Sequence, residues 1–226
     1  MDSSVQDGLL RIGYMFVPFL FAIVGHEFGH GWVAHLWGDD SAKENGRLTL
    51  NPTPHLDPIG TLLLPLISMI TGSSLFFGWA RPVPINPNRF RKYRPGLFWV
   101  SLAGPLANAI MAMGCALLLC LLVRFAPADF AFSKEFQTML LGGIQINFGL
   151  GIFNLLPIPP LDGSKIIESG LSYEATRKYE QLQQYSFFIL ILLIATNALS
   201  FLSGPILWLS HMTLNLAALI TGAQLY

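Results

Sequence analysis

The chain has 226 residues, of which 53% are hydrophobic and only 12% are charged. An ordinary soluble domain is about one quarter charged, so this composition favours a membrane protein and argues against a soluble enzyme. The 13 basic and 13 acidic residues cancel, which gives no electrostatic reason to expect a nucleic-acid partner. The length fits a single membrane domain covering residues 1–226.

The first predicted membrane element covers residues 8–37. A spanning helix needs about 20 mostly apolar residues, and this run is long enough. Asp2 and Asp7 stand where a cleavable signal sequence would carry basic residues, so we expect the segment to be retained. Its second half contains the string HEFGH at 26–30.

Residues 38–96 are predicted to form a cytoplasmic and membrane-dipping region. Basic residues occur in both of its polar connections, 38–58 and 78–96, and basic loops favour the cytoplasmic side. A segment that joins two loops on one side must cross an even number of times. The apolar run 59–77 between them is therefore predicted to be a re-entrant hairpin.

Three shorter stretches in this region have a pattern of their own. GRLTLN (46–51) and ARPVPIN (80–86) alternate in character, which predicts two short β-strands, with plain loops as the open alternative. The basic run RFRKYR (89–94) is predicted to anchor the chain to acidic lipid headgroups.

Two core helices are predicted at 97–123 and 136–158. The first is rich in Ala, Gly and Met, and small residues let helices approach closely in lipid. The connection 124–135 carries few basic residues and is predicted to be external, whereas 159–184 is predicted to be internal and contains the sequence LDG.

The last apolar run, 185–222, is long enough for two helices with a break near Gly204-Pro205. The predicted fold class is therefore an all-α polytopic membrane protein with five or so transmembrane helices, plus the re-entrant hairpin with short strands. The N-terminus is predicted outside and the C-terminus inside.

The HEFGH string predicts a metal site. Residues four apart share a helix face, so His26 and His30 can bind one metal ion while Glu27 lies beside that face. The alternative is a chance string whose histidines form hydrogen bonds within a bundle. Ionisable groups at membrane depth are expensive and functional by default, which favours the metal.

A third ligand must come from elsewhere, because catalytic zinc usually has three protein ligands. The best candidate is Asp162 in NLLPIPPLDGSK (154–165), which follows a Pro-rich break at the end of a predicted span. The alternative is that Asp162-Gly163 forms an ordinary turn or a helix N-cap.

Other ionisable residues are weaker candidates. Glu44 and the pair His55 and Asp57 stay open, because they lie in turn-rich chain whose position the sequence does not fix. His35 follows His26 by nine residues, which places it on the opposite side of a helix.

Two separated motifs, HEFGH (26–30) and NLLPIPPLDG (154–163), resemble those of the site-2 protease family of intramembrane zinc metalloproteases. SLAGPLAN (101–108) between them is similar to a further family element. The chain looks like the compact form, because no PDZ or CBS domain is inserted between the motifs.

The resemblance implies one Zn²⁺ per chain, with ligands His26, His30 and Asp162 and with Glu27 as the catalytic acid/base. It also points to Asn154 and Asn108 as polar residues near the site. We add His55 as a further candidate for substrate or oxyanion binding.

The implied activity is hydrolysis of peptide bonds in or near transmembrane segments of membrane proteins, in a bacterial-type cell membrane and with the active site toward the cytoplasm. The expected partners are a transmembrane protein or peptide substrate and the lipid bilayer, and the sequence leaves the oligomeric state open. The edges of the predicted strands 46–51 and 80–86 could capture an unwound substrate.

Two other classes of function use the same residues. A metal-ion transporter or channel would coordinate a passing ion, and a membrane scaffold would hold no stoichiometric metal. Glu27 discriminates between enzyme and transporter, because a transport site could tolerate Glu27→Gln while a hydrolase should lose turnover.

Overall fold

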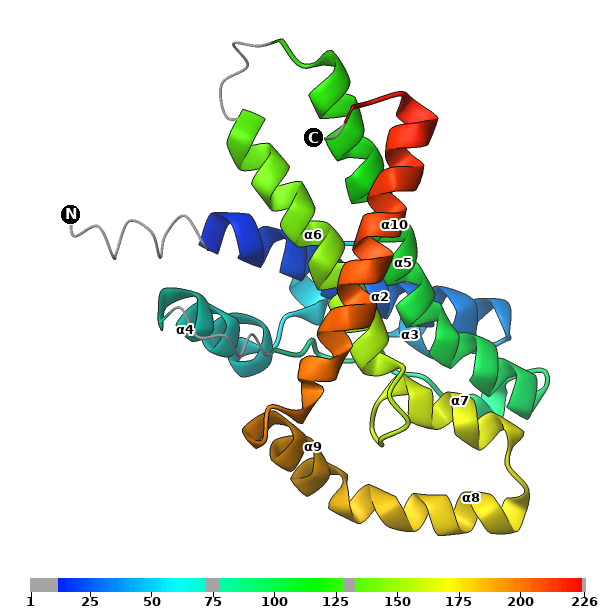
Figure 1. Cartoon of the computed structure of the whole chain (residues 1–226). Helices are drawn as coiled ribbons and strands as arrows, with labels where there is room; N and C mark the ends of the chain where they lie inside the picture. Colours follow the sequence, from blue (N-terminus) through cyan, green and yellow to red (C-terminus); the bar gives the residue numbers. More distant parts are fainter. Residues whose placement is uncertain (1–11, 72–77, 128–132, 225–226) are drawn as a thin grey trace.

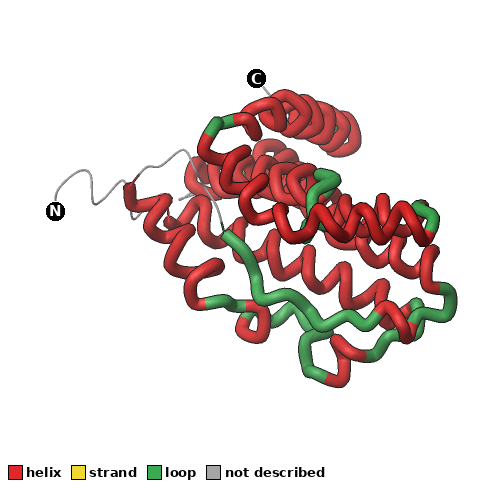
Figure 2. Tube along the Cα trace, turned by 90° about the horizontal axis from the view of Figure 1, so that it is seen from below, coloured by secondary structure: helices red, strands yellow, loops and turns green. Residues whose placement is uncertain are grey.

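The computed structural model describes residues 12–71, 78–127 and 133–224. These residues form helices joined by loops (Figures 1 and 2). The helices are η1 (Ile12–Phe16), α2 (Val17–Leu36), α3 (Ser41–Glu44), η2 (Thr53–His55), η3 (Pro58–Leu63), α4 (Leu64–Thr71), η4 (Pro87–Arg89), α5 (Tyr93–Phe125), α6 (Ser133–Asn154), α7 (Asp162–Gly170), α8 (Tyr173–Glu180), η5 (Gln181–Tyr185), α9 (Ser186–Ala195), η6 (Ala198–Leu202) and α10 (Ser203–Thr221).

Helix α5 is the centre of the bundle. It is 33 residues long and packs against α2, α6, α7 and α10. Its small buried residues Ala112, Ala116 and Cys120 pack with Ile144 of α6 and Ala217 of α10. Small side chains at four-residue spacing let the neighbouring helices come close without a bulky core.

Three of the described helical segments are long and apolar enough to cross a membrane: Tyr93–Phe125, Lys134–Asn154 and Ala198–Thr221. The first two overlap the predicted core helices 97–123 and 136–158, although α6 ends at Asn154 and not at residue 158. The predicted first span is also helical, as η1 and α2 together, but the three histidines and one glutamate within α2 lower its hydropathy.

Residues 185–222 form two helices, as predicted, but only α10 belongs to a segment long enough to span a membrane. Helix α9 has only 10 residues, which is too short to span. The chain breaks at Asn197, whose φ of 53° is left-handed, and not at Gly204-Pro205. Those two residues lie in the first turn of α10, where a proline is tolerated because its missing N–H has no helical partner.

The single helix α10 also changes the predicted side of the C-terminus. The Arg124 guanidinium donates to the carbonyl oxygen of Gly222 at 2.6 Å. The C-terminal ends of α5 and α10 therefore lie side by side, as Figure 1 shows. Residue 222 thus lies at the end of the bundle from which the connection 124–135 leaves, whereas the charge pattern predicted opposite sides.

The predicted re-entrant segment leaves and returns at one place. The Trp79 N–H donates to the carbonyl of Gly60 at 3.1 Å, and the Thr61 hydroxyl donates to the carbonyl of Trp79 at 2.7 Å. Between these points η3 and α4 run outward, and the tip of the predicted hairpin, 72–77, lies outside the described residues. This return is the geometry that a hairpin requires.

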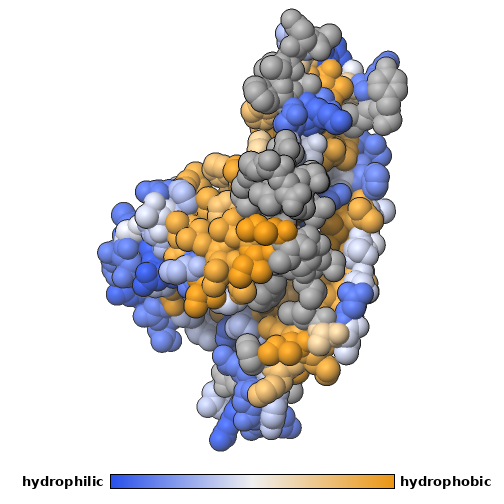
Figure 3. Space-filling model, turned by 90° about the vertical axis from the view of Figure 1, so that its left-hand side faces the viewer, coloured by the Kyte–Doolittle hydropathy of each residue, from blue (hydrophilic) through white to orange (hydrophobic). Residues whose placement is uncertain are grey.

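The face that carries α4 is strongly apolar (Figure 3). Ile59, Leu63, Ile67 and Ile70 recur along η3 and α4, and each is about half exposed or more. Exposed apolar residues in such a continuous stripe mark a surface that water does not cover. We therefore expect this face to contact lipid.

The two predicted strands are not formed in the described residues (Figure 2). Residues 46–51 form turns and bends, and 80–86 are irregular. The second stretch contains two prolines that cannot donate to a strand ladder. Three of its other N–H groups have acceptors outside any strand: Val83 donates to the Glu27 side chain, Asn86 donates to the Asp39 side chain, and Arg81 donates to the carbonyl of His55.

Candidate metal centre

Three side chains from distant parts of the chain converge at one point. His26 Nε2 and His30 Nε2 on α2 lie 3.1 Å apart. Asp162 Oδ2, from the first residue of α7, lies 3.2 Å from each of them. The two histidines are buried and the aspartate is half-buried. The sequence predicted this set, and the fold brings it together.

Asp162 reaches the histidines because the chain folds back between α6 and α7. The cap position of α7 is Leu161, and the Asp162 carboxylate makes no capping hydrogen bond, so the turn-or-cap alternative does not account for its orientation. Gly163 permits the fold: a Cβ there would lie 2.2 Å from the carbonyl oxygen of Leu155. Only a residue without a side chain lets α7 begin so close to the end of α6.

Both imidazoles are fixed through their Nδ1 atoms. His30 Nδ1 lies 2.7 Å from the carbonyl oxygen of Val100 on α5. A carbonyl can only accept, so His30 Nδ1 carries the proton and His30 Nε2 presents a lone pair. His26 Nδ1 lies 2.7 Å from Asn108 Oδ1, and the same assignment follows for it from the bonds of that amide.

Asn108 has no freedom to rotate its amide. Its Nδ2 group donates to the carbonyl of Ala22 and to Asn147 Oδ1. Asn147 in turn donates its own Nδ2 to the carbonyl of Gly143. Because every donor in this chain has a fixed acceptor, Asn108 Oδ1 accepts from His26 Nδ1, and His26 Nε2 carries a lone pair.

The resulting arrangement is that of a cation site. Two imidazole lone pairs and a carboxylate oxygen face one another, and Asp162 Oδ2 is a buried atom without a hydrogen-bond partner. Three acceptors at such distances repel one another unless a cation lies between them. Tetrahedral zinc with bonds of about 2.0–2.1 Å sets its ligand atoms roughly 3.3 Å apart, close to the separations seen here.

Gly104 on α5 forms the wall behind the two rings. A Cβ at this position would lie 2.3 Å from His30 Nε2 and 2.7 Å from His26 Cε1. Any larger residue would push the imidazoles out of place. The glycine in the AGP sequence of α5 is therefore a requirement of the metal geometry.

Glu27 lies beside the pair on α2 and is half-buried. One of its carboxylate oxygens, Oε2, accepts the backbone N–H of Val83 at 2.8 Å. The irregular segment 78–86 thus runs past the carboxylate and holds it by one oxygen. The other oxygen accepts no hydrogen bond from the residues that the structure describes and can serve a water molecule or a peptide nitrogen.

The other ionisable residues considered from sequence are engaged elsewhere. His35 contacts Asp40, and Asp57 accepts the N–H groups of Ile59 and Gly60 at the start of η3. Glu44 accepts two hydrogen bonds from Arg89.

The bond between Glu44 and Arg89 has an electrostatic consequence. It raises the pKa of the Arg89 guanidinium above its ordinary value, because a hydrogen-bonded carboxylate favours the charged form.

The three candidate residues for substrate or oxyanion binding have different surroundings. His55 is fully buried, with Nε2 on the carbonyl of Thr49 and Nδ1 without a partner. Asn154 donates to the carbonyl of Leu150 in its own helix. Asn108 holds His26 and has no donor left for a substrate.

Sequence reasoning missed Asn147, which completes the chain of hydrogen bonds behind His26. The sequence signal for Asn147 was an amide side chain inside an apolar run, because such residues in membrane helices form hydrogen bonds with a neighbouring helix.

Comparison with known proteins gives the same direction. Residues 86–196, which include Asp162, match the sequence model of Peptidase family M50. The chain is 38% identical over 208 residues to "Putative zinc metalloprotease YwhC" of Bacillus subtilis, an alignment that covers 92% of this chain and 91% of that protein.

It is 35% identical over 182 residues to "Putative zinc metalloprotease Rip2" of Mycolicibacterium smegmatis, covering 80% and 66% of the two chains. The protein of the same name from Mycobacterium tuberculosis is 32% identical over 201 residues, covering 86% and 71%. No solved structure matches the chain.

Proposed function

The chain belongs to peptidase family M50, the site-2 protease family, and is a metalloprotease; from this premise we propose that it is a zinc-dependent endopeptidase acting within the membrane. Its substrates are membrane proteins, which it hydrolyses in or near their transmembrane segments. The observation that carries the proposal is the convergence of His26, His30 and Asp162, with both imidazoles held in the tautomer that binds a metal.

Zinc is the metal that fits this donor set, because two nitrogens and one carboxylate leave a fourth tetrahedral position open. When bound, it supplies Lewis-acid polarisation of a peptide carbonyl and of water. His26, His30 and Asp162 would hold it, and two backbone-anchored contacts on α5 would keep the histidines in place.

Glu27 is the proton carrier of the proposal. It lies one residue after His26 on the same helix turn, and Val83 holds one of its oxygens. The free oxygen takes a proton from the attacking water and gives it to the departing amine nitrogen. Because the carboxylate is already held in position, it loses little conformational freedom when it transfers the proton.

Asn108 and Asn147 position His26 and do not touch the substrate. Together they link α2, α5 and α6 through one hydrogen-bonded chain of amides. Outer partners of metal-binding histidines fix the ring orientation and raise its basicity. The substrate's own helix must unwind before its carbonyls become accessible, because they are hydrogen-bonded within it.

Regarding location, the three apolar helices and the family membership support a membrane protein. We propose that the active site opens toward the cytoplasm of a bacterial-type cell membrane. The basic residues of 78–96 and of α8 supply the support for this orientation.

The test uses purified protein and a cleavable membrane substrate. Glu27→Gln should retain one zinc per chain and lose cleavage, whereas His26→Ala should lose both. The matched control is His35→Ala, which removes a histidine of the same helix whose side chain contacts Asp40 and Trp32 and not the metal centre. Cleavage that survives in both site variants would refute the endopeptidase.

The same variants separate the alternatives. A metal-ion transporter would keep most of its flux with Glu27→Gln, and a scaffold would bind no stoichiometric zinc in the wild type. Zinc analysis and a vesicle uptake assay, run on the same preparations, distinguish these outcomes from proteolysis.

A further inference from the structure

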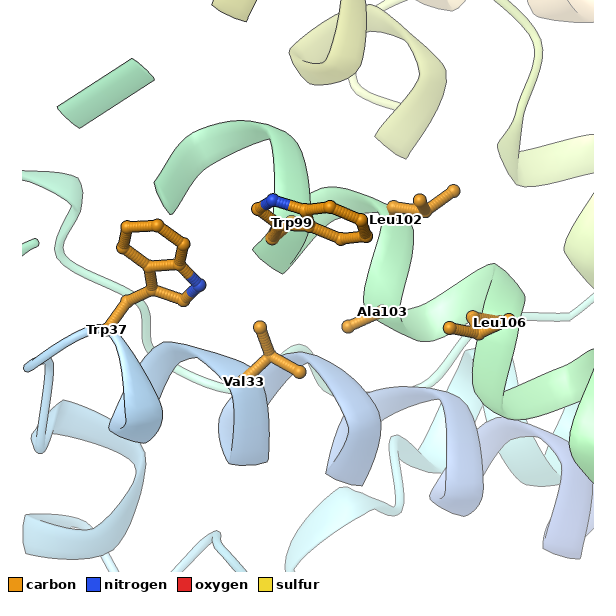
Figure 4. A pocket seen from close by; sticks show the side chains of 6 residues that line it. All are labelled: Val33, Trp37, Trp99, Leu102, Ala103 and Leu106. Atoms are coloured by element: carbon orange, nitrogen blue, oxygen red, sulfur yellow. The ribbon is translucent and has the colours of Figure 1, made fainter. Parts of the chain in front are cut away.

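A groove lies on the surface between α2 and α5 (Figure 4). It has a volume of about 260 Å³ and is apolar almost throughout. We call it the tryptophan groove; its lining residues are Val33, Trp37, Trp99, Leu102, Ala103 and Leu106. Figure 4 shows Val33 and Trp37 from the α2 side facing the other four from α5.

The groove lies on a surface that lipid should cover. It runs along α5, which is apolar and long enough to span a membrane. Trp99 and Leu106 are each about half exposed although both are large and hydrophobic. Tryptophan is typical of the boundary between hydrocarbon and headgroups, where its ring is apolar and its N–H polar. The groove therefore begins at that boundary and continues toward the hydrocarbon.

Uncompensated positive charge lies at the boundary end of the groove. Arg91, Lys92 and Arg94 are exposed, and none of them forms an ion pair with any residue that the structure describes. Arg91 lies next to the groove, because its backbone N–H donates to the carbonyl of Trp37 at 2.9 Å. The neighbouring Arg89 differs, since Glu44 neutralises it.

The first turn of α5 adds to this charge. It contains no acidic residue, although acidic side chains are favoured there and basic ones are not. Three cations at this end of the helix repel one another and the helix dipole. An anion placed among them would relieve both repulsions.

We propose that the tryptophan groove and the three basic residues bind one anionic phospholipid. An acyl chain lies in the groove, and the phosphate lies among Arg91, Lys92 and Arg94. Charge complementarity selects this occupant over a zwitterionic lipid. The small size of the groove favours an acyl chain over a transmembrane helix, whose diameter with side chains is about 10–12 Å.

The lipid site is linked to the metal centre by contacts between α2 and α5, and this step rests on the proposed function. Val33 lies one helical turn after His30. The backbone carbonyl of Val100, the residue after Trp99, accepts the hydrogen bond of His30 Nδ1. Ala103 lies against Gly29, where a Cβ would meet its carbonyl at 2.8 Å. An acyl chain bound in the groove would hold in place the two helix turns that orient His30.

The direct test is quenching of tryptophan fluorescence by lipids with brominated acyl chains. A variant that keeps Trp99 and replaces the other four tryptophans by Phe is placed in vesicles of phosphatidylcholine. Brominated phosphatidylglycerol or brominated phosphatidylcholine is then added, and the quenching by each lipid is compared over the same range of mole fractions. We expect the anionic lipid to occupy the site at roughly fivefold lower mole fraction, because several basic groups attract it.

Two controls locate the effect. A variant that keeps only Trp208, an exposed residue of α10, should be quenched equally by both lipids. Replacing Arg91, Lys92 and Arg94 by Gln should abolish the preference at Trp99. Replacing the exposed basic pair Arg177 and Lys178 of α8 by Gln should leave it intact.

Equal quenching of Trp99 by the two lipids would overturn the proposal, as would a preference that survives the triple Gln variant. A preference of the same size at Trp208 would also overturn it, because it would show general enrichment at the protein surface. Native mass spectrometry of the wild type and the triple variant gives the same comparison without removing tryptophans, with phosphatidylglycerol retained only by the wild type.

Zinc content and substrate cleavage of these preparations separate the two proposals. A chain that shows the lipid preference but never cleaves a membrane substrate would contradict the proposed function and leave the lipid site standing. A chain that cleaves equally well without any lipid preference would contradict the lipid site alone.

Discussion

Two buried histidine environments in this protein differ in what surrounds the second ring nitrogen. His26 and His30 each use Nδ1 on a fixed acceptor and turn Nε2 toward a carboxylate. His55 is at least as deeply buried, but its Nε2 lies on the carbonyl of Thr49 and its Nδ1 faces no partner.

The difference shows that burial of a histidine does not by itself indicate a metal ligand. What distinguishes the α2 pair is convergence: two lone pairs and one acidic oxygen point to a common centre. The single hydrogen bond of the His55 ring goes to the backbone carbonyl of Thr49, which is typical of a structural role.

The largest effect is expected for Asp162→Ala. Without its carboxylate the site keeps two neutral imidazoles, which is too few ligands for catalytic zinc. Zinc per chain should fall from one to near zero, as measured by atomic absorption, and cleavage should be lost. His55→Ala, measured in parallel, should keep its zinc; loss of zinc there would contradict the distinction between the two environments.

The next effect is expected for Gly104→Ala, which tests the wall behind the rings. The added methyl would overlap both imidazoles, so we expect weaker zinc binding in a competition titration with a chelator. Gly114→Ala is the matched control, because it lies on the same helix and a Cβ there has nothing within 4 Å. Equal zinc affinity of the two variants would refute the close approach of α5 to the histidines.

An intermediate effect is expected for the amide chain. Asn108→Leu should reduce zinc affinity by roughly 10- to 100-fold, because outer partners of metal-binding histidines have effects of that size. Asn147→Leu should reduce it less, since Asn108 keeps its bond to the carbonyl of Ala22. Asn154→Leu should leave zinc affinity unchanged, because its amide bonds only to its own helix.

The smallest effect on the metal is expected for His55→Ala, which should act on stability instead. Loss of the bond to Thr49 and of the filled volume should lower the free energy of unfolding by about 1–3 kcal/mol. A thermal shift assay would show this as a lower melting temperature. A variant with unchanged stability and lost activity would instead return His55 to the list of functional residues.

The ligands of the metal centre could be predicted from the sequence because each is marked by a short local pattern of residues. The spacing of His26 and His30 is a property of any α-helix, and a polar Asp162 after a Pro-rich break at the end of an apolar run stands out. The positions of the α5 and α6 spans were predictable from apolar length, whereas their ends differ by a few residues from the predicted ones.

The parts that failed depend on packing between distant segments. The role of Asn108 follows from the proximity of Ala22 and Asn147, which only the assembled bundle supplies. The predicted strand at 80–86 is not formed, and two of its N–H groups donate instead to the side chains of Glu27 and Asp39. The break at Asn197 was missed because Gly204-Pro205 is the stronger local signal, although a helix start tolerates it.

The separation of the ligands along the chain has a consequence for biosynthesis. Two imidazoles emerge from the ribosome with the first quarter of the protein, whereas the carboxylate at residue 162 follows after α5 and α6 have been made. A nascent chain without Asp162 therefore lacks the donors for tight zinc capture. With this ligand set, the growing polypeptide cannot complete its metal centre until residue 162 of 226 has been made.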